Sequence, residues 1–360
     1  MKMKDEMKIR STLVPEVANM IWVESELHQA QRDTVKQLGY KCTDFYYNET
    51  IPTGANIILV QGPYGPILPL VKQLQLYPKE TRPVFIYWFQ QNLNLSVPKP
   101  LRQFFGRLFS NLVYTFKQAG WLEIWLHKLF PNFFGVRGRY LANIGDILWL
   151  HKQGMLDVLG LSSKIYVRIF LDLGIQSTFV QRGYDPRYGK ILDEDRDIAL
   201  VWMGAIRNKR RRRFVYWLKD QLEKRGLTML IFDGVNTPFI FGEKRTQILN
   251  RTWFVANIYE HLTYDLSVRF IHAGANGAVV ITEPSPNQYP FVPGIHMVEC
   301  PVKEMPNRIM YYISHPEEWE KISSANFKLI SEELTLERTI STLMEAAIDK
   351  LALRSASQMI

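Results

Sequence analysis

The 360-residue chain is poor in cysteine, with only Cys42 and Cys300, which cannot form a disulfide framework and lack the spacing of metal ligands. No apolar run reaches the roughly 18 residues that a spanning helix needs. The charged start, MKMKDEMKIRS, also differs from a secretory signal. From these absences we expect a cytoplasmic protein with reduced thiols.

Several ligand motifs are missing as well. The chain has no G-x-G-x-x-G and no G-x-x-x-x-G-K-[ST], so dinucleotide and P-loop sites lack support. Asp44, Asp157 and Asp233 do not form a D-x-D metal motif, and no Cys/His cluster suggests zinc. We therefore expect no metal and no cofactor.

The charge that is present is mostly positive. The chain has 44 Lys and Arg against 35 Asp and Glu, which gives a net charge of +9 at pH 7. This balance favours anionic partners: nucleic acid, nucleotide phosphates or an acidic membrane surface. The run Arg210–Arg213 stands without an RNA-binding motif, which argues against nucleic acid and leaves a solvated helix face or a phosphate site.

The length favours two domains, and short apolar strands alternate with helical patterns in both halves. Strands are predicted at Asn56–Gln61, Pro83–Phe89, Ile198–Met203, Met229–Phe232, Trp253–Ile258 and Ala278–Thr282. Helices are predicted at Met20–Leu38, Leu68–Leu76, Gly154–Leu173, Arg210–Lys224, Glu243–Leu249, Leu266–Ala275, Pro301–Ser314, Pro316–Leu329 and Leu334–Leu353. The alternation predicts an α/β protein with doubly wound sheets, whose ligands bind beyond the carboxyl ends of the strands. The polar, proline-containing segment at 184–197 is interpreted as a linker between domains.

The first candidate site follows the strand predicted at 198–203. Gly204 permits a sharp turn, and Asn208 is placed to cap the next helix. Free N–H groups and the positive dipole end at that helix start suit a phosphate. The cations of this segment are Arg207, Lys209 and Arg210. These cations would neutralise a diphosphate leaving group, whose negative charge grows in the transition state. The alternative is a basic helix start that is simply solvated.

The second candidate site is SVRFIHAGANGAVVI (267–281). Its small residues allow close backbone packing, and Asn276-Gly277 turns the chain into the next strand. Arg269 can fork onto phosphate oxygens, although an ion pair with Asp265 or Glu283 is an alternative.

This second segment resembles the E-A-x-A-x-G-x-P-V-I segment of GT-B glycosyltransferases of the glycosyl transferases group 1 type. It is closer still to the CgeB-like (spore maturation protein) branch, whose helix carries Arg-x-Phe before that segment. Neighbouring segments resemble the family pattern in the same order: 197–204, 248–258, 290–294 and 305–316. The resemblance implies a GT-B fold, in which two Rossmann-like doubly wound domains flank an interdomain cleft.

The same resemblance implies a hexosyltransferase-type enzyme of polysaccharide biosynthesis. It would move a sugar from a nucleotide-diphosphate donor to a hydroxyl of a glycan, lipid-linked or small-molecule acceptor. The implied domains are 1–184 on the acceptor side, a linker at 185–197, a nucleotide-sugar domain at 198–335, and a helix at 336–360 that crosses back to the first domain. The implied donor contacts are Gly204, Arg207, Lys209, Arg210, Asn257, Arg269, His272, Asn276 and Gly277.

One departure concerns two glutamates of the family, which are replaced here by Tyr264 and His272. His272 could bind a ribose hydroxyl or a phosphate, or it could simply have a local partner on its helix. A retaining enzyme of this fold needs no obvious side-chain base, whereas an inverting one takes an Asp, Glu or His from the N-terminal domain. The candidates for that role are His28, Asp146 and His151.

Residues 99–140 combine aromatic side chains at helical spacing with many cations. Such a segment suits peripheral contact with the inner face of a membrane, or it lines the domain core or the interdomain cleft. Two other functions stay open. One is a noncatalytic GT-B-like scaffold in a surface-polysaccharide pathway, which the loss of the two glutamates favours. The other is a nucleic-acid binder, whose binding would depend strongly on salt.

Overall fold

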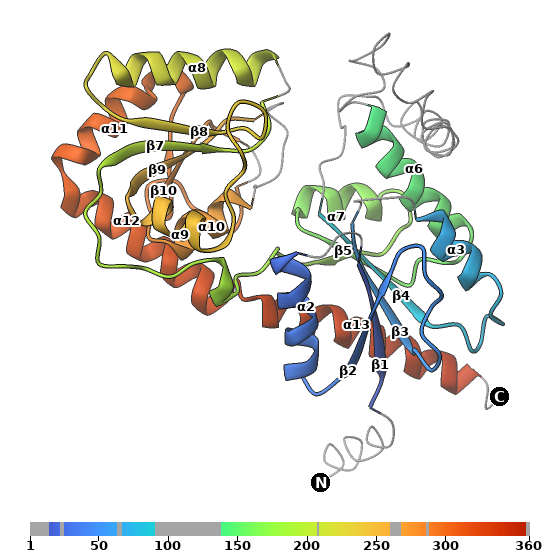
Figure 1. Cartoon of the computed structure of the whole chain (residues 1–360). Coiled ribbons are helices and arrows are strands. Elements are labelled where there is room, and N and C mark those ends of the chain that lie inside the picture. Colours follow the sequence, from blue (N-terminus) through green and yellow to red (C-terminus); the bar gives the residue numbers. More distant parts are fainter. Residues whose placement is uncertain are drawn as a thin grey trace. The chain divides into compact units, whose positions relative to one another are not determined.

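The computed structural model describes residues 14–21, 25–62, 67–90, 138–206, 209–259, 268–285 and 288–357. The chain forms two compact units (Figure 1). The first unit contains residues 1–180 and 340–360, and the second contains residues 181–339.

The first unit contains a parallel sheet of six strands in the order β2-β1-β3-β4-β5-β6. The strands are β1 (Glu16–Ile21), β2 (Lys41–Tyr46), β3 (Ile57–Gly62), β4 (Val84–Phe89), β5 (Val158–Leu161) and β6 (Thr178–Phe179). Strands β3 and β4 are buried along their whole length, as expected for parallel strands covered on both faces.

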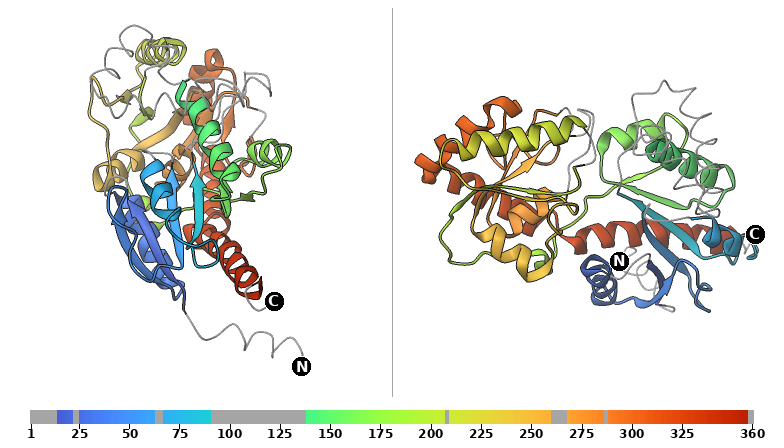
Figure 2. Two further views of the ribbon diagram at one scale, coloured as in Figure 1. Left: turned by 90° about the vertical axis from the view of Figure 1, so that its right-hand side faces the viewer. Right: turned by 45° about the horizontal axis from the view of Figure 1, so that its top comes forward.

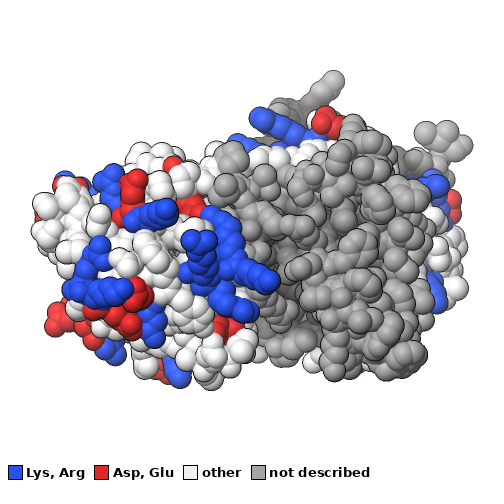
Figure 3. All heavy atoms as spheres, turned by 90° about the horizontal axis from the view of Figure 1, so that it is seen from above, with Lys and Arg blue, Asp and Glu red and all other residues white. Residues whose placement is uncertain are grey.

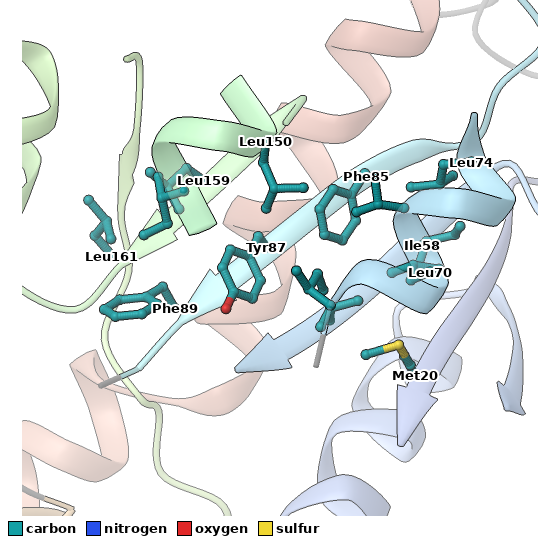
Figure 4. Close-up of a cluster of buried hydrophobic side chains, with 14 of the residues drawn as sticks. Met20, Ile58, Leu70, Leu74, Phe85, Tyr87, Phe89, Leu150, Leu159 and Leu161 are labelled. Carbon is teal, nitrogen blue, oxygen red and sulfur yellow. The ribbon is translucent and has the colours of Figure 1, made fainter. Parts of the chain in front are cut away.

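Helices cover both faces of this sheet (Figures 1 and 2). They are α2 (Glu26–Gln37), α3 (Leu68–Leu74), α6 (Gly138–Lys152), α7 (Lys164–Leu171) and the later part of α13 (Leu336–Ser357). Figure 4 shows the core between the sheet and one helical layer, where Tyr87 of β4 lies near Leu150 of α6, and Phe89 of β4 lies near Leu161 of β5. The Ser25 hydroxyl caps α2 and accepts the His28 backbone N–H at 3.4 Å.

Helix α13 completes the other side of the first unit. Leu343 and Met344 are fully buried, and Leu343 packs so closely on β5 that a Cβ on Gly160 would stand 2.8 Å from its Cδ2. Farther along the helix, Arg354 donates a 2.5 Å hydrogen bond to Asp157. The first sheet therefore takes part of its core from the end of the chain.

The second unit contains a parallel sheet of five strands in the order β11-β10-β9-β7-β8. The strands are β7 (Ile198–Met203), β8 (Met229–Phe232), β9 (Thr252–Asn257), β10 (Val279–Thr282) and β11 (Val298–Glu299). Helices α8 (Lys209–Glu223) and α11 (Met305–Ser314) pack together on one face (Figure 1). Helices α9 (Gly242–Asn250) and α10 (Arg269–Ala275) lie on the other, and α12 (Pro316–Lys328) contacts α10 and β10.

The structure differs from the sequence analysis in several elements. Residues 16–21, partly inside the helix predicted at Met20–Leu38, form β1, because the apolar side chains of this segment are buried on both faces of a strand. The helices expected through Gly154–Leu173 are interrupted by β5. The short strands β2, β6 and β11 were not predicted.

The segment interpreted as a linker packs within the second unit. It contains a short 3₁₀ helix, Pro186–Tyr188, and the Tyr188 side chain is buried. Arg196 donates to the carbonyls of Leu249 and Thr252 and lies over the Trp319 ring, 4.6 Å from its centroid. Burial lowers the pKa of Arg196 to about 10, so the guanidinium remains charged at neutral pH. The domain limits inferred from the sequence stay a proposal.

In the part of the chain that the structure describes, no helix combines the length and the apolarity needed to span a bilayer.

Candidate functional site

The second sheet changes direction at β7. From β7 the chain moves outward to β8 and then returns across β7 to β9, so β7 has β8 on one side and β9 on the other. The loops that follow β7 and β9 therefore leave in opposite directions and open a place for a ligand at the carboxyl ends of these strands. Met203 and Asn257 are the last residues of the two strands.

Arg269 joins these two strand ends. Its Nε donates to the Met203 carbonyl at 2.7 Å, and its Nη1 donates to Asn257 Oδ1 at 3.1 Å. The guanidinium lies 4.5 Å from the centroid of the Trp202 ring, within the range of a cation–π contact. The Asn257 amide is oriented by its own bond from Nδ2 to Thr282 Oγ1, 3.1 Å. The positively charged guanidinium of Arg269 thus lies at the switch point of the sheet.

Gly204 is needed for this arrangement. Its φ of +133° is disfavoured for residues with a Cβ, and its N–H donates to the Phe232 carbonyl at 2.9 Å. The Arg269 guanidinium fills the position that a Cβ on residue 204 would occupy. The Trp202 indole N–H donates to the Gly204 carbonyl at 2.7 Å and fixes the turn from below.

Arg210 has a different role from the one that the sequence suggested. It pairs with buried Glu283, and its Nη1 donates to the Tyr259 carbonyl at 2.7 Å. Glu283 also accepts the Tyr259 N–H at 2.9 Å. Arg210 therefore connects the segments that follow β7, β9 and β10. The ion pair considered for Arg269 with Glu283 is made by Arg210 instead, and Asp265 lies outside the described residues.

The start of α8 is strongly basic. Lys209, Arg212 and Arg213 are exposed, and Arg211 donates to the Ile258 carbonyl at 3.0 Å. Lys and Arg side chains gather on this side of the second unit (Figure 3). Arg207 and Asn208 lie outside the described residues.

Asn276 and Gly277 do not share the edge with Gly204. Helix α10 runs back from the carboxyl edge, and β10 begins at Val279, so both residues lie at the amino edge of the sheet. A Cβ on Gly277, which has φ +69°, would stand 2.8 Å from the Arg196 side chain just before β7. Asn276 donates to the His272 carbonyl at 2.8 Å, which caps the end of α10. The predicted donor set thus divides into a group at the carboxyl edge and a pair at the amino edge.

His272 lies between these groups, in the middle of α10. Its ring meets the Tyr188 ring edge-on, with centroids 5.4 Å apart, and its Nδ1 is buried without a hydrogen-bond partner among the described residues. Burial lowers the pKa of His272 well below 6.5, and the cations of Arg245 and Arg182 lower it further. The imidazole is therefore neutral at pH 7 and offers hydrogen bonds rather than charge.

The three base candidates of the first unit lie in different places. His28 stands in the first turn of α2, directly after β1, and its ring Nδ1 is 2.8 Å from the Ser25 hydroxyl. The chain leaves β1 for β2 and returns to β3, so the carboxyl ends of β1 and β3 form the switch point of this sheet. His151 lies in the last turn of α6, near the amino edge, and Asp146 lies in the middle of that helix.

Two further predictions from the sequence concern metal binding and membrane contact. Among the residues described, no group of three or more His, Cys, Asp and Glu side chains is placed to hold a metal ion. The segment Asp193–Asp197 contains D-x-D spacings, but it leads into β7 at the amino edge, and Asp197 pairs with Arg251. Of the basic-aromatic segment 99–140, residues 99–137 lie outside the described part.

Sequence reasoning named Glu283 only as an alternative partner of Arg269 and missed its pairing with Arg210. The position of Glu283 directly after the buried strand β10 was a signal for a role at this edge of the sheet. The loop 233–241 follows β8 at the same edge, and its aromatic residues were passed over because they form no helical or strand pattern.

Comparisons with known proteins bear on the fold and on the class of activity. Residues 203–345 match a family model described as glycosyl transferase-like. No curated protein matches the sequence. The Anabaena protein HepE, crystallised with UDP and glucose, has 11% identity and a TM-score of 0.57, over 94% of this chain and 99% of its own. Sucrose-phosphate synthase from Thermosynechococcus elongatus has 11% identity and a TM-score of 0.55, over 94% of this chain and 100% of its own.

These similarities confirm the predicted α/β fold of the GT-B type. The family model over residues 203–345 agrees with the prediction of a glycosyltransferase for this part of the chain. The CgeB-like branch and the individual site residues stay predictions.

Proposed function

We propose that this chain, which has a GT-B fold, is a glycosyltransferase and that it binds the diphosphate of a nucleotide-sugar donor at the carboxyl ends of β7 and β9. The observation that carries the proposal is the position of Arg269, which is bonded to the last residue of both strands. A ligand at this switch point would meet the Arg269 guanidinium together with the Gly204 turn.

The charge at the start of α8 supports the same location. Five consecutive cations, Lys209–Arg213, occupy the positive end of a helix, where each cation is unfavourable by about 0.3–1 kcal/mol. Glu283 offsets one of them, Arg210. A bound diphosphate would add negative charge at this helix start. As the leaving group, the diphosphate gains charge in the transition state, so these cations would favour transfer more than ground-state binding.

For the donor we propose a uridine nucleotide as the first to test, because HepE was crystallised with UDP and glucose. From the carboxyl-edge group we assign Gly204, Lys209, Asn257 and Arg269 to the donor site, with Arg207 added from the sequence. We propose that Arg210 positions the loops, that His272 supplies a neutral hydrogen-bonding group, and that Asn276 and Gly277 shape the end of α10.

For the acceptor we propose a hydroxyl group bound by the first unit, on a glycan, a lipid-linked sugar or a small molecule. His28 is the proposed base if transfer inverts the anomeric centre. When its Nδ1–H donates to the Ser25 hydroxyl, Nε2 carries the lone pair that can take the acceptor proton. His28 is placed better than Asp146 and His151, because it alone of the three follows a strand at a switch point. We propose that transfer needs no metal ion, and that the enzyme acts in the cytoplasm, with peripheral membrane contact through residues 99–140.

A noncatalytic GT-B-like scaffold is the second candidate, favoured by the replacement of the two family glutamates by Tyr264 and His272. Calorimetric titration with UDP, GDP and TDP distinguishes the two, since a scaffold would bind none of them tightly.

The test compares Arg269→Ala with a matched control. We expect Arg269→Ala to weaken nucleotide binding about 10- to 100-fold, the range for losing a charged hydrogen-bonding group of about 1.5–3 kcal/mol. Arg225→Ala removes an exposed arginine at the far end of α8 and should leave binding unchanged. Equal affinities in the wild type and in Arg269→Ala would remove Arg269 from the site.

A further inference from the structure

A short loop after β8 presents apolar side chains to solvent. The loop, residues 233–241, joins Phe232 at the end of β8 to Gly242 at the start of α9. Val235 is 82% exposed, Phe241 is 68% exposed and Phe239 is 44% exposed. Of these side chains, Phe239 and Phe241 are in contact, and an exposed apolar patch of this kind is typical of a site that binds a ligand or a partner.

The loop is held in a defined conformation. The Asp233 carboxylate accepts the backbone N–H groups of Val235 and Asn236 at 2.8 and 2.7 Å, and that of Thr237 at 3.2 Å. The Thr237 carbonyl in turn accepts the Gly234 N–H at 2.8 Å. These bonds raise the order of the loop before any ligand arrives, which lowers the entropy lost on binding.

The two phenylalanine rings form a single surface. The Phe239 ring packs on Gly234, whose φ is +73°, in the position that a Cβ on residue 234 would take. The Phe239 and Phe241 rings meet edge to face, with centroids 6.4 Å apart. The Asp233 carboxylate is engaged by backbone N–H groups and by the Asn236 side chain, and most of the Phe241 side chain is open to solvent.

The loop that carries these rings begins beside the proposed phosphate site. The Phe232 carbonyl, from which the loop begins, accepts the Gly204 N–H at 2.9 Å. Strands β7 and β8 are neighbours, about 4.8 Å apart as in any sheet. Helix α9 carries the chain back toward the amino edge before β9, so Phe241, its N-terminal cap, lies at the carboxyl edge.

From the exposed rings and their place at the same sheet edge we propose that Phe241, supported by Phe239, is the platform on which the base of the nucleoside diphosphate stacks. The inference rests on the proposed function, because it takes the diphosphate at Gly204 and Arg269 as its reference point. Stacking on a ring face tolerates any base, since every base has such a face, so the platform adds affinity with little selectivity among bases.

The experiment measures binding of UDP and of inorganic pyrophosphate by calorimetry to the full-length chain. Pyrophosphate reports the phosphate site alone, and UDP reports the phosphate site together with the platform. We expect Phe241→Ala to weaken UDP binding about tenfold, within the range for losing one stacked ring, and to leave pyrophosphate binding unchanged. Phe241→Trp should restore UDP binding to at least the wild-type affinity. Tyr311→Ala, which removes a partly exposed aromatic ring on α11, is the matched control and should change neither affinity.

Three results would overturn the inference. Unchanged UDP affinity in Phe241→Ala would show that no base rests on the ring. Equal losses for UDP and pyrophosphate would show that the substitution disturbs the loop as a whole. A change in oligomeric state without a change in affinity would assign the surface to protein contact. Wild-type protein that binds neither probe would instead refute the proposed phosphate site, and the platform with it.

Discussion

Gly204 and Arg269 should be energetically coupled, because the guanidinium of one occupies the space where a side chain on the other would stand. The substitution Gly204→Ala therefore perturbs two things together. It places a Cβ on a residue with φ +133°, and it displaces the Arg269 side chain from Met203 and Asn257.

The magnitudes can be worked out separately. A disfavoured backbone conformation costs about 1–3 kcal/mol. Displacing Arg269 removes two hydrogen bonds, each contributing about 1 kcal/mol net, and a cation–π contact with Trp202 of about 0.5–1 kcal/mol. We expect Gly204→Ala to lower the free energy of unfolding by about 3.5–6 kcal/mol in the wild type. In an Arg269→Ala background only the backbone strain remains, about 1–3 kcal/mol.

The assay is a double-mutant cycle followed by urea unfolding. The four proteins are the wild type, Gly204→Ala, Arg269→Ala and the double variant. The expected coupling is about 2.5–3 kcal/mol, the contribution of the displaced contacts. Nucleotide titration of the same proteins should show that Gly204→Ala weakens binding about as much as Arg269→Ala does.

Additive effects, with coupling below about 0.5 kcal/mol, would refute this reasoning, since they would show that the guanidinium does not occupy that space. Normal nucleotide affinity in Gly204→Ala would separately show that the position of Arg269 is unimportant for the ligand.

Three further predictions concern other parts of the chain. Gly183→Ala should lower the free energy of unfolding by about 2 kcal/mol more than Gly226→Ala. Both glycines have φ near +75°, but only at Gly183 would a Cβ meet backbone atoms, with the Leu336 Cα at 2.5 Å. Equal losses of stability for the two variants in urea unfolding would contradict this close packing. The pKa of His272 is lower in the folded chain than its ordinary 6.5, so the unfolded chain binds more protons and stability should fall as pH drops below about 6.5, by up to about 1.4 kcal/mol per pH unit. His272→Gln should reduce this dependence of stability on pH more than His296→Gln does. Identical profiles of stability against pH in the wild type and the two variants would exclude a contribution from His272. Sugar transfer should persist in EDTA, and activity that is lost in EDTA and restored by Mg²⁺ would disprove metal-independent transfer.

The sequence predicted the buried strands well and the edges poorly, for a physical reason. Parallel strands covered on both faces have uninterrupted apolar sequences, as in IALVWM of β7 and VFIYWF of β4. Strand β2, KCTDFY, lies at the edge of its sheet with most side chains partly or fully exposed, so it lacks that signal. Strand β1 was partly absorbed into a predicted helix, because short apolar spacings fit either period.

The candidate site was predicted in its residue types but not in its pairings. Gly204 and Arg269 were recognised from the segments around them, whereas the partners of Arg269 depend on how strands β7 and β9 are placed in the sheet. Glu283 lies 73 residues from Arg210, and nothing local in the sequence indicates that the two meet. Asn276 and Gly277 were grouped with the donor contacts because they share a segment with Arg269, although the helix between them spans the sheet from edge to edge.

The passage of α13 into the first unit has a consequence for how the protein is made. The first unit consists of residues 1–180 and 340–360, and its C-terminal segment contributes three fully buried side chains, Leu343, Met344 and Ala347. During translation, part of the hydrophobic surface of the first sheet therefore remains uncovered until the whole second unit has emerged from the ribosome. The unit whose synthesis begins first is thus the last to complete its hydrophobic core.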